Sequence, residues 1–195
     1  MEKEKATKKL WIILLCVCLL FITFATVGFV LFSNRKPEIV NEQLEGGSIV
    51  LNYSSNSSYL NVSNAVPTTD TVGMSSSENG TYFDFSVDTK IDDAKSITYE
   101  LSLKKVKGNV PENDIVVYLE KEDSGTYSPI IKPIGFKKIK KDSKFGTKKN
   151  SMILLTEEKD KSVIDNYRLR TWISEKSSVT NGNYQLEINI IATAK

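Results

Sequence analysis

The clearest strand pattern in this sequence is Ile97-Thr98-Tyr99-Glu100-Leu101-Ser102-Leu103. Apolar and polar residues alternate along it without interruption. This alternation is typical of a β-strand, because successive side chains of a strand point to opposite faces of its sheet. The stretch therefore predicts a strand with its apolar face in a core and its polar face toward solvent.

Seven further segments are short and rich in apolar, β-branched and aromatic residues, with Asn, Asp, Ser, Gly or Pro between them. They cover residues 49–53, 60–62, 82–87, 115–119, 152–155, 167–173 and 184–190. Helical patterns are weak, and the best is a short turn near residues 157–164. Because the strands follow one another without helices between them, we predict an all-β fold: a single antiparallel β-sandwich of about seven or eight strands, immunoglobulin-like or jelly-roll-like.

The composition excludes several kinds of catalytic and metal site. The chain has 195 residues, with 26 Lys and Arg, 24 Asp and Glu, two Cys and no His. Without His there is no Ser-His-Asp triad, no Cys-His dyad and no His-ligated metal. Both cysteines, Cys16 and Cys18, lie in one apolar run, so the rest of the chain has no disulfide, Cys-ligated zinc or thiol nucleophile. We expect no cofactor and no enzymatic activity.

The apolar run covers residues 10–32 and contains no charged residue. At 1.5 Å per residue a helix of this length spans about 34 Å, enough to cross a bilayer. Four lysines precede the run and two basic residues follow it, so the positive-inside rule places the N-terminus in the cytoplasm. We predict a cytoplasmic tail at 1–9, a transmembrane helix at 10–32, a linker at 33–47 and an extracellular domain at 48–195.

A signal peptide is the alternative interpretation of the N-terminal region. Thr23-Phe24-Ala25 resembles a small-x-small cleavage site that follows an apolar core at 10–22. Cleavage there would leave the apolar residues 26–32 at the start of the mature chain, which is an awkward product. We therefore expect the segment to stay as an anchor in the cell membrane, with cleavage as the alternative.

Eight lysines gather between residues 132 and 149, where Asp142 is the single acidic residue. Outside the cell such a segment suits anionic polymers of an envelope or anionic lipid head groups. The alternative is a solvated hairpin whose lysines keep a sheet edge soluble. We expect no nucleic-acid binding, because the segment has only two aromatic residues and lies outside the cytoplasm. The candidate residues are Lys132, Lys137, Lys138, Lys140, Lys141, Lys144, Lys148 and Lys149.

Three other patterns suggest a site, and each has a simpler structural interpretation. Ser102 and Lys105 have the spacing of a Ser-Lys pair, which works on a helix but places the side chains on opposite faces of a strand. A group of acidic residues could surround calcium, although it lacks the Asp-x-Asp-x-Asp-Gly pattern. Residues 168–172 place Arg, Arg and Trp on one strand face, as a ligand platform or as the covered outer side of a sheet. The acidic residues are Asp84, Asp88, Asp92 and Asp93.

Two stretches carry a resemblance to known proteins: Asn-Ala-Val-Pro-Thr-Thr-Asp at 64–70 and Tyr-Arg-Leu-Arg-Thr-Trp-Ile at 167–173. Their order resembles small exported or membrane-anchored all-β surface proteins of Gram-positive and related bacteria. More distantly, it is similar to the camelysin and biofilm-fibre group of β-sandwich proteins. The resemblance implies a surface location and assembly. A protease role has been attached to camelysin, but this chain has no His-Glu-x-x-His motif, so no functional residue is carried over.

These observations lead to one expected function and two alternatives. We expect a membrane-anchored surface protein whose β domain binds a partner in the cell envelope or assembles with copies of itself. The first alternative is a precursor that is cleaved near Ala25 and released as a fibre or matrix subunit. The second is a hydrolase that uses carboxylates or a Ser-Lys pair, for which two carboxylates should converge in a concave pocket.

Overall fold

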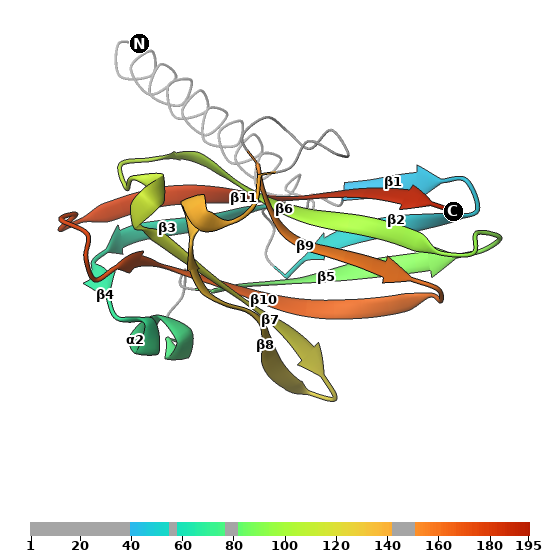
Figure 1. Ribbon diagram of the computed structural model, residues 1–195, viewed down its shortest axis with the longest axis horizontal. Helices are drawn as coiled ribbons and strands as arrows, with labels where there is room; N and C mark the ends of the chain where they lie inside the picture. Colours follow the sequence, from blue (N-terminus) through green and yellow to red (C-terminus); the bar gives the residue numbers. More distant parts are fainter. Residues whose placement is uncertain (1–39, 55–57, 77–81, 142–150) are drawn as a thin grey trace, which may run out of the picture. The chain divides into compact units, whose positions relative to one another are not determined.

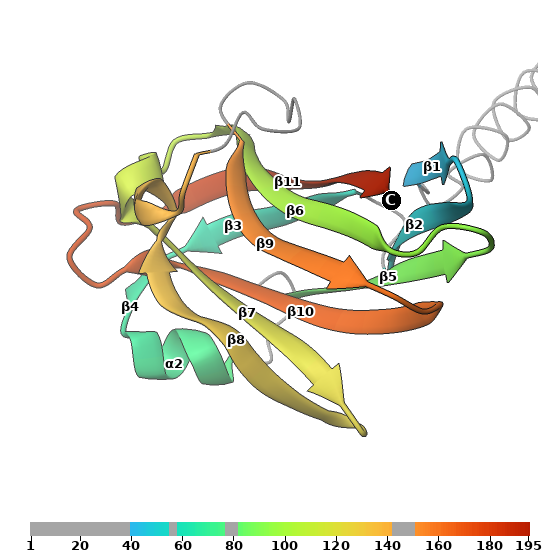
Figure 2. The same ribbon diagram turned by 45° about the vertical axis from the view of Figure 1, so that its right-hand side comes forward.

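The alternating segments form strands, and the strands pair into two sheets that lie one over the other (Figures 1 and 2). The computed structural model describes residues 40–54, 58–76, 82–141 and 151–195, which belong to one compact unit. Nearly all strand pairs are antiparallel; the exception is a two-residue parallel pair. The predicted all-β class is therefore confirmed.

The larger sheet has seven strands, and β10 lies near its centre between β5 and β7. The short strand β4 pairs in parallel with the end of β10, beyond the part that pairs with β5. Six strands follow one another across the sheet in the order β1 (Val40–Leu44), β2 (Gly47–Tyr53), β5 (Tyr82–Ile91), β10 (Val163–Ser174), β7 (Ile115–Asp123) and β8 (Thr126–Gly135), and the seventh is β4 (Pro67–Thr68).

The smaller sheet has four strands, and the long pair formed by β6 and β11 is its centre. Three short helices lie in the connections between strands. The strand order is β3 (Tyr59–Ala65), β11 (Gly182–Ala194), β6 (Ile97–Gly108) and β9 (Met152–Lys159). The helices are α2 (Asp70–Ser75), η1 (Glu112–Asp114) and η2 (Phe136–Lys138).

The stretch 97–103 forms the first half of β6 and supplies the middle of the core. Its four apolar side chains are fully buried, and they belong to one cluster with buried residues of the larger sheet such as Leu169. The hydroxyl groups of Tyr99 and Tyr167 lie 2.7 Å apart and join the two sheets by a hydrogen bond. Burial of each large apolar side chain contributes about 1.5–3 kcal/mol, so this strand holds the sheets together.

All eight predicted strands are present, but the described residues contain eleven. The strand β1 lies within 33–47, where we expected only a linker, so β structure begins at Val40 instead of Ser48. The strand β8 was missed because Pro129 and Pro133 interrupt its pattern. Proline removes a backbone donor and is tolerated here because β8 lies at the sheet edge. The third addition is the two-residue strand β4.

The predicted helical turn near 157–164 is wrong. These residues form the end of β9, a tight turn and the start of β10. The charged side chains of Glu157 and Lys159 obscured the strand pattern in the sequence. The strand accommodates them because they pair with residues of opposite charge on the other sheet. A helix occurs instead at 70–75, where the Thr69 hydroxyl accepts a hydrogen bond from the Val72 N–H at 3.4 Å.

The predicted transmembrane segment, residues 10–32, lies outside the described residues. Within the part of the chain that the structure describes, no helix has the length and apolar character needed to span a bilayer.

Candidate functional site

The described half of the lysine-rich segment is a short surface strip that follows β8. Phe136 and Ile139 are buried and hold this strip to the core, while the lysines around them are exposed. The strip thus has an apolar side in the core and a basic side in solvent. Lys137, Lys138, Lys140 and Lys141 lie on the strip, Lys132 lies on β8, and Lys144, Lys148 and Lys149 lie outside the described residues.

Four of the five described lysines have no acidic partner in the described part of the chain. Lys137 is the exception, because its Nζ lies 2.5 Å from Glu112 Oε2. Across the described ranges, the side chains of Lys132, Lys138, Lys140 and Lys141 make no ion pair. Their positive charges are therefore available to an external anion.

Arg168 and Arg170 on the outer face of β10 differ from these lysines, because both are paired. Arg168 forms two hydrogen bonds with Asp84, at 2.7 and 2.8 Å, and its guanidinium lies 4.2 Å from the centre of the Tyr127 ring. The Asp84 carboxylate raises the pKa of Arg168. Arg170 pairs with Glu120 at 2.8 Å. These contacts favour the covered sheet face over the ligand platform.

Trp172 completes this face and is covered by α2. The indole N–H donates to Asp70 Oδ1 at 3.1 Å, and Gly73 lies against the ring. Only 4% of the Trp172 surface is exposed. The indole is therefore part of the packing between α2 and the sheet.

A charged cluster lies between the sheets beside the hydroxyl pair of Tyr99 and Tyr167. Lys121 contacts Asp165 at 3.0 Å and Glu157 at 3.1 Å, and Lys159 contacts both carboxylates as well. Burial alone would raise the carboxyl pKa values, but hydrogen bonds from Lys159 and Lys121 lower the pKa of both Glu157 and Asp165.

Two carboxylates do converge in this cluster, as a carboxylate-based hydrolase would require. Each is held ionised by two ammonium groups, whereas a general acid must keep its proton near neutral pH. The pocket described below is also lined by other residues. The cluster is therefore an ionic connection between the sheets, and its geometry gives no support to a hydrolase.

The other two sequence patterns are not brought together into a site. Ser102 is fully buried on β6, while the ammonium group of Lys105 donates to the Gly108 carbonyl at 3.0 Å. Of the acidic group near residue 90, Asp84 is already paired with Arg168. Among the residues described, no three His, Cys, Asp or Glu side chains are placed to hold a metal ion.

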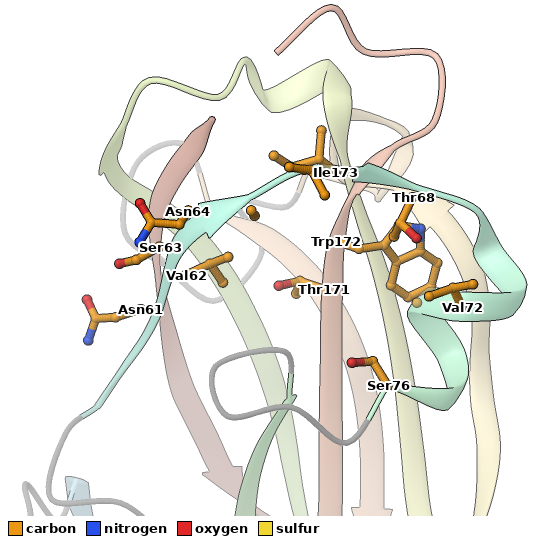
Figure 3. Close-up of a pocket in the computed structure, with 13 residues that line it drawn as sticks. Asn61, Val62, Ser63, Asn64, Thr68, Val72, Ser76, Thr171, Trp172 and Ile173 are labelled. Atoms are coloured by element: carbon orange, nitrogen blue, oxygen red, sulfur yellow. The ribbon is translucent and has the colours of Figure 1, made fainter. Parts of the chain in front are cut away.

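A pocket of about 380 Å³, which sequence reasoning missed, lies where the chain passes from β3 to β4 (Figure 3). Its walls come from β3 and β4, from α2 and from residues 171–173 of β10. In Figure 3 the Val62 side chain points into the space, whereas Asn61, Ser63 and Asn64 point away from it. The strand β3 therefore contributes mainly its backbone and one apolar side chain.

The two stretches quoted above for their resemblance lie side by side at this pocket. Pro67 and Thr68 pair with Ile173 and Ser174, and residues from both stretches line the space. The one sequence signal that could have indicated the pocket is that the two stretches occur in this order. The residues between them give no indication that the two stretches are in contact. The pocket depends on the tertiary structure.

Comparison with protein-family models yields no match for this chain. The curated proteins likewise include none with a significant match. The functional proposal below therefore rests on the sequence and on the geometry of the described residues.

Proposed function

We propose that this chain is a membrane-anchored bacterial surface protein whose β-sandwich domain binds anionic polymers of the cell envelope and catalyses no reaction. The apolar run at 10–32 serves as a single transmembrane helix, with residues 1–9 in the cytoplasm and the domain outside. The uncharged length of this run and the four lysines before it support that topology. Residues 40–47 belong to the domain in this proposal, because they are already part of the sheet.

The observation that carries the binding function is that four exposed lysines without an acidic partner in the described part of the chain gather between residues 132 and 141. Arg168, Arg170, Lys121 and Lys159 are each bonded to a carboxylate. The lysines at 132, 138, 140 and 141 have no such partner in the described part of the chain. A cation without a partner gains more from an external anion, because no internal ion pair has to be broken first.

The strength of such binding follows from the number of lysines. Each lysine near an anionic surface contributes about 1 kcal/mol, so four unpaired lysines suffice for reversible retention on a polyanion. Because the lysines are exposed, dissolved salt screens them within a Debye length of about 8 Å. Retention on the envelope should therefore depend steeply on salt.

Two variants of equal charge test this proposal. One replaces the four unpaired lysines, three on the strip and Lys132 on the adjoining β8 (Lys132→Gln, Lys138→Gln, Lys140→Gln, Lys141→Gln; called the strip variant). The control replaces four exposed lysines elsewhere (Lys95→Gln, Lys107→Gln, Lys161→Gln, Lys176→Gln). We expect the strip variant to elute from isolated cell walls at clearly lower salt than the wild type, with the control unchanged. Equal shifts for both variants, or no shift for either, would show that the strip is not the binding site.

The competing possibility is that the chain is cleaved near Ala25 and released as a fibre or matrix subunit. Fractionation of cells that carry a C-terminally tagged chain separates the two, with the tagged product sized by mass spectrometry. We expect full-length protein in the membrane fraction, accessible to protease added outside. A product that starts near Thr26, in the medium or in insoluble fibres, would replace the anchor with the released subunit.

A further inference from the structure

The pocket between β3 and α2 is neutral. Thirteen residues line it, and none of them is acidic, basic or a cysteine. Thr68 and Ser76 line the α2 side, and the backbone of β3 lines the other. Thr171 lies on β10 between them, and its hydroxyl is hydrogen-bonded to the Tyr184 hydroxyl at 3.0 Å. Arg170 lies nearby, but its guanidinium is bonded to Glu120 and to the Ser76 carbonyl. A charged ligand would therefore lose its hydration on entering the pocket and would find no side chain of opposite charge there.

The walls of the pocket are fixed before any ligand arrives. On one side, Asp70 and Gly73 hold α2 against Trp172. On the other, the Asn64 N–H donates to the Asn183 side chain at 3.0 Å, and this bond supports Asn64 in a left-handed conformation with φ of 55°. A preformed site loses little ordering entropy on binding.

The pocket also combines apolar contacts with hydrogen-bonding groups. Two of the five most exposed large apolar side chains in the described residues, Val66 and Val72, line it. The Thr68 hydroxyl makes no hydrogen bond within the described part of the chain, so it is available as both donor and acceptor. Among the described strands, β3 pairs with β11 alone. The backbone groups of every second β3 residue therefore point away from β11 and are further hydrogen-bonding groups.

The shape of the pocket favours a compact ligand over an extended peptide strand. The left-handed Asn64 bends β3, and the chain then crosses to the other sheet as β4. A strand added along β3 would lose its register at this bend. The site therefore suits a ring-sized molecule that carries adjacent hydroxyl groups and an apolar face.

We infer that the pocket formed by β3, β4, α2 and β10 binds a neutral sugar unit, with Thr68 donating or accepting a hydrogen bond and Val72 contacting the apolar face of the ring. This site is separate from the lysine strip, which takes anions. It would let one domain recognise both a charged and an uncharged component of an envelope polymer.

Binding is measured by saturation-transfer NMR on the full-length chain, in a detergent whose headgroup is not a sugar. The probes are methyl glycosides of glucose, galactose and N-acetylglucosamine, with glucuronic acid as the charged comparison. We expect saturable binding of at least one neutral glycoside and none of the acid. Thr68→Val should weaken binding roughly two- to tenfold, the loss expected for one hydrogen bond. Val72→Trp should abolish binding by filling the pocket.

Two matched variants control for general effects. Thr126→Val removes an exposed hydroxyl on β8, and Ile164→Trp places the same large side chain at an exposed position near the start of β10. Both should bind as the wild type does. The inference is wrong if no neutral glycoside binds at millimolar concentration, if Thr68→Val and Val72→Trp bind as well as their controls, or if the acid or an uncharged peptide binds instead. The lysine-strip variant should keep sugar binding, which separates this result from the envelope proposal.

Discussion

At the scale of single residues, small side chains decide how α2 covers the sheet. Gly73 is the residue of α2 that meets the indole of Trp172, and a Cβ atom added there would lie 2.2 Å from Trp172 Cδ2. The absence of a side chain allows the helix backbone to lie directly on the ring. Trp172 is thereby buried on the outer face of the sheet, where an aromatic residue would otherwise be exposed to water.

Gly73→Ala should destabilise the protein, although alanine favours helices in general. The helix preference would contribute about 1 kcal/mol, whereas forcing α2 off the rigid indole costs about 1–3 kcal/mol or more. We expect a net loss of stability in urea unfolding, together with a red shift of tryptophan fluorescence as Trp172 meets water. Val72→Ala, at an exposed position of the same helix, is the control. A Gly73→Ala protein as stable as the wild type would show that α2 does not pack on Trp172 in this way.

At the scale of elements, the ionic cluster fixes how β9 and β10 meet the neighbouring strands. The Lys159 ammonium group on β9 lies 2.7 Å from the Asp165 carboxylate on β10. Lys121 on β7 contacts the carboxylates of both Asp165 and Glu157. Burial raises the pKa of Tyr99 beside the cluster. Ionic contacts take the place of apolar packing at this part of the sandwich. The contribution of the cluster to folding stability therefore depends on the charge state of its members.

The cluster should make folding stability fall at low pH. The pKa values of Glu157 and Asp165 are lower in the folded protein than their ordinary values of 4.5 and 3.8. Their contribution is therefore complete above about pH 5 and is lost as pH falls through the folded pKa values. Urea unfolding from pH 7 to pH 2.5 measures this loss.

Asp165→Asn provides the control for this pH dependence. The variant should lose about 1–3 kcal/mol at pH 7, because it leaves Lys159 and Lys121 with one carboxylate in place of two. It should also lose less stability than the wild type on acidification. Parallel pH curves for the two proteins would contradict the assignment of the acid sensitivity to this cluster.

At the scale of the whole molecule, β1 ties the start of the domain to its end. It pairs with β2 from Val40↔Leu51 to Leu44↔Gly47. The Glu42 carboxylate accepts a hydrogen bond from the Ala192 N–H of β11 at 3.1 Å, so β1 also contacts the smaller sheet. The strand therefore bridges the two sheets close to the C-terminus.

A chain that starts at Ser48 should be less stable than one that starts at Pro37. The shorter chain loses the whole β1 strand and its link to β11, and we expect its midpoint of thermal unfolding to fall by roughly 5 °C or more. Differential scanning calorimetry of the two truncated chains measures this difference. Glu42→Ala in the longer chain isolates the share that belongs to the link between sheets. Equal midpoints for both truncated chains would show that β1 adds nothing to the domain.

The β class and the positions of eight strands could be predicted from local patterns in the sequence. The alternation at 97–103 was sufficient because one face of β6 lies in the core and is apolar. The expectation that its polar face meets solvent was wrong for Glu100 and Ser102, which are also buried. The lysine strip was also visible, because charge density is a local property of the chain. The short strand β4, the edge strand β8 and the first strand β1 were missed, since they have few buried side chains and so carry weak periodicity.

The pairing of the charged side chains and the position of the pocket depend on the tertiary structure. Glu157 and Lys159 look like solvent-exposed residues in the sequence, yet they find Asp165 and Lys121 across the sandwich. Thr68 and Thr171 are 103 residues apart in the chain and line the same pocket because β4 pairs with the end of β10. The periodicity of a segment indicates which of its side chains face water and which face the core. Contacts between distant segments depend instead on strand order, which no local pattern encodes.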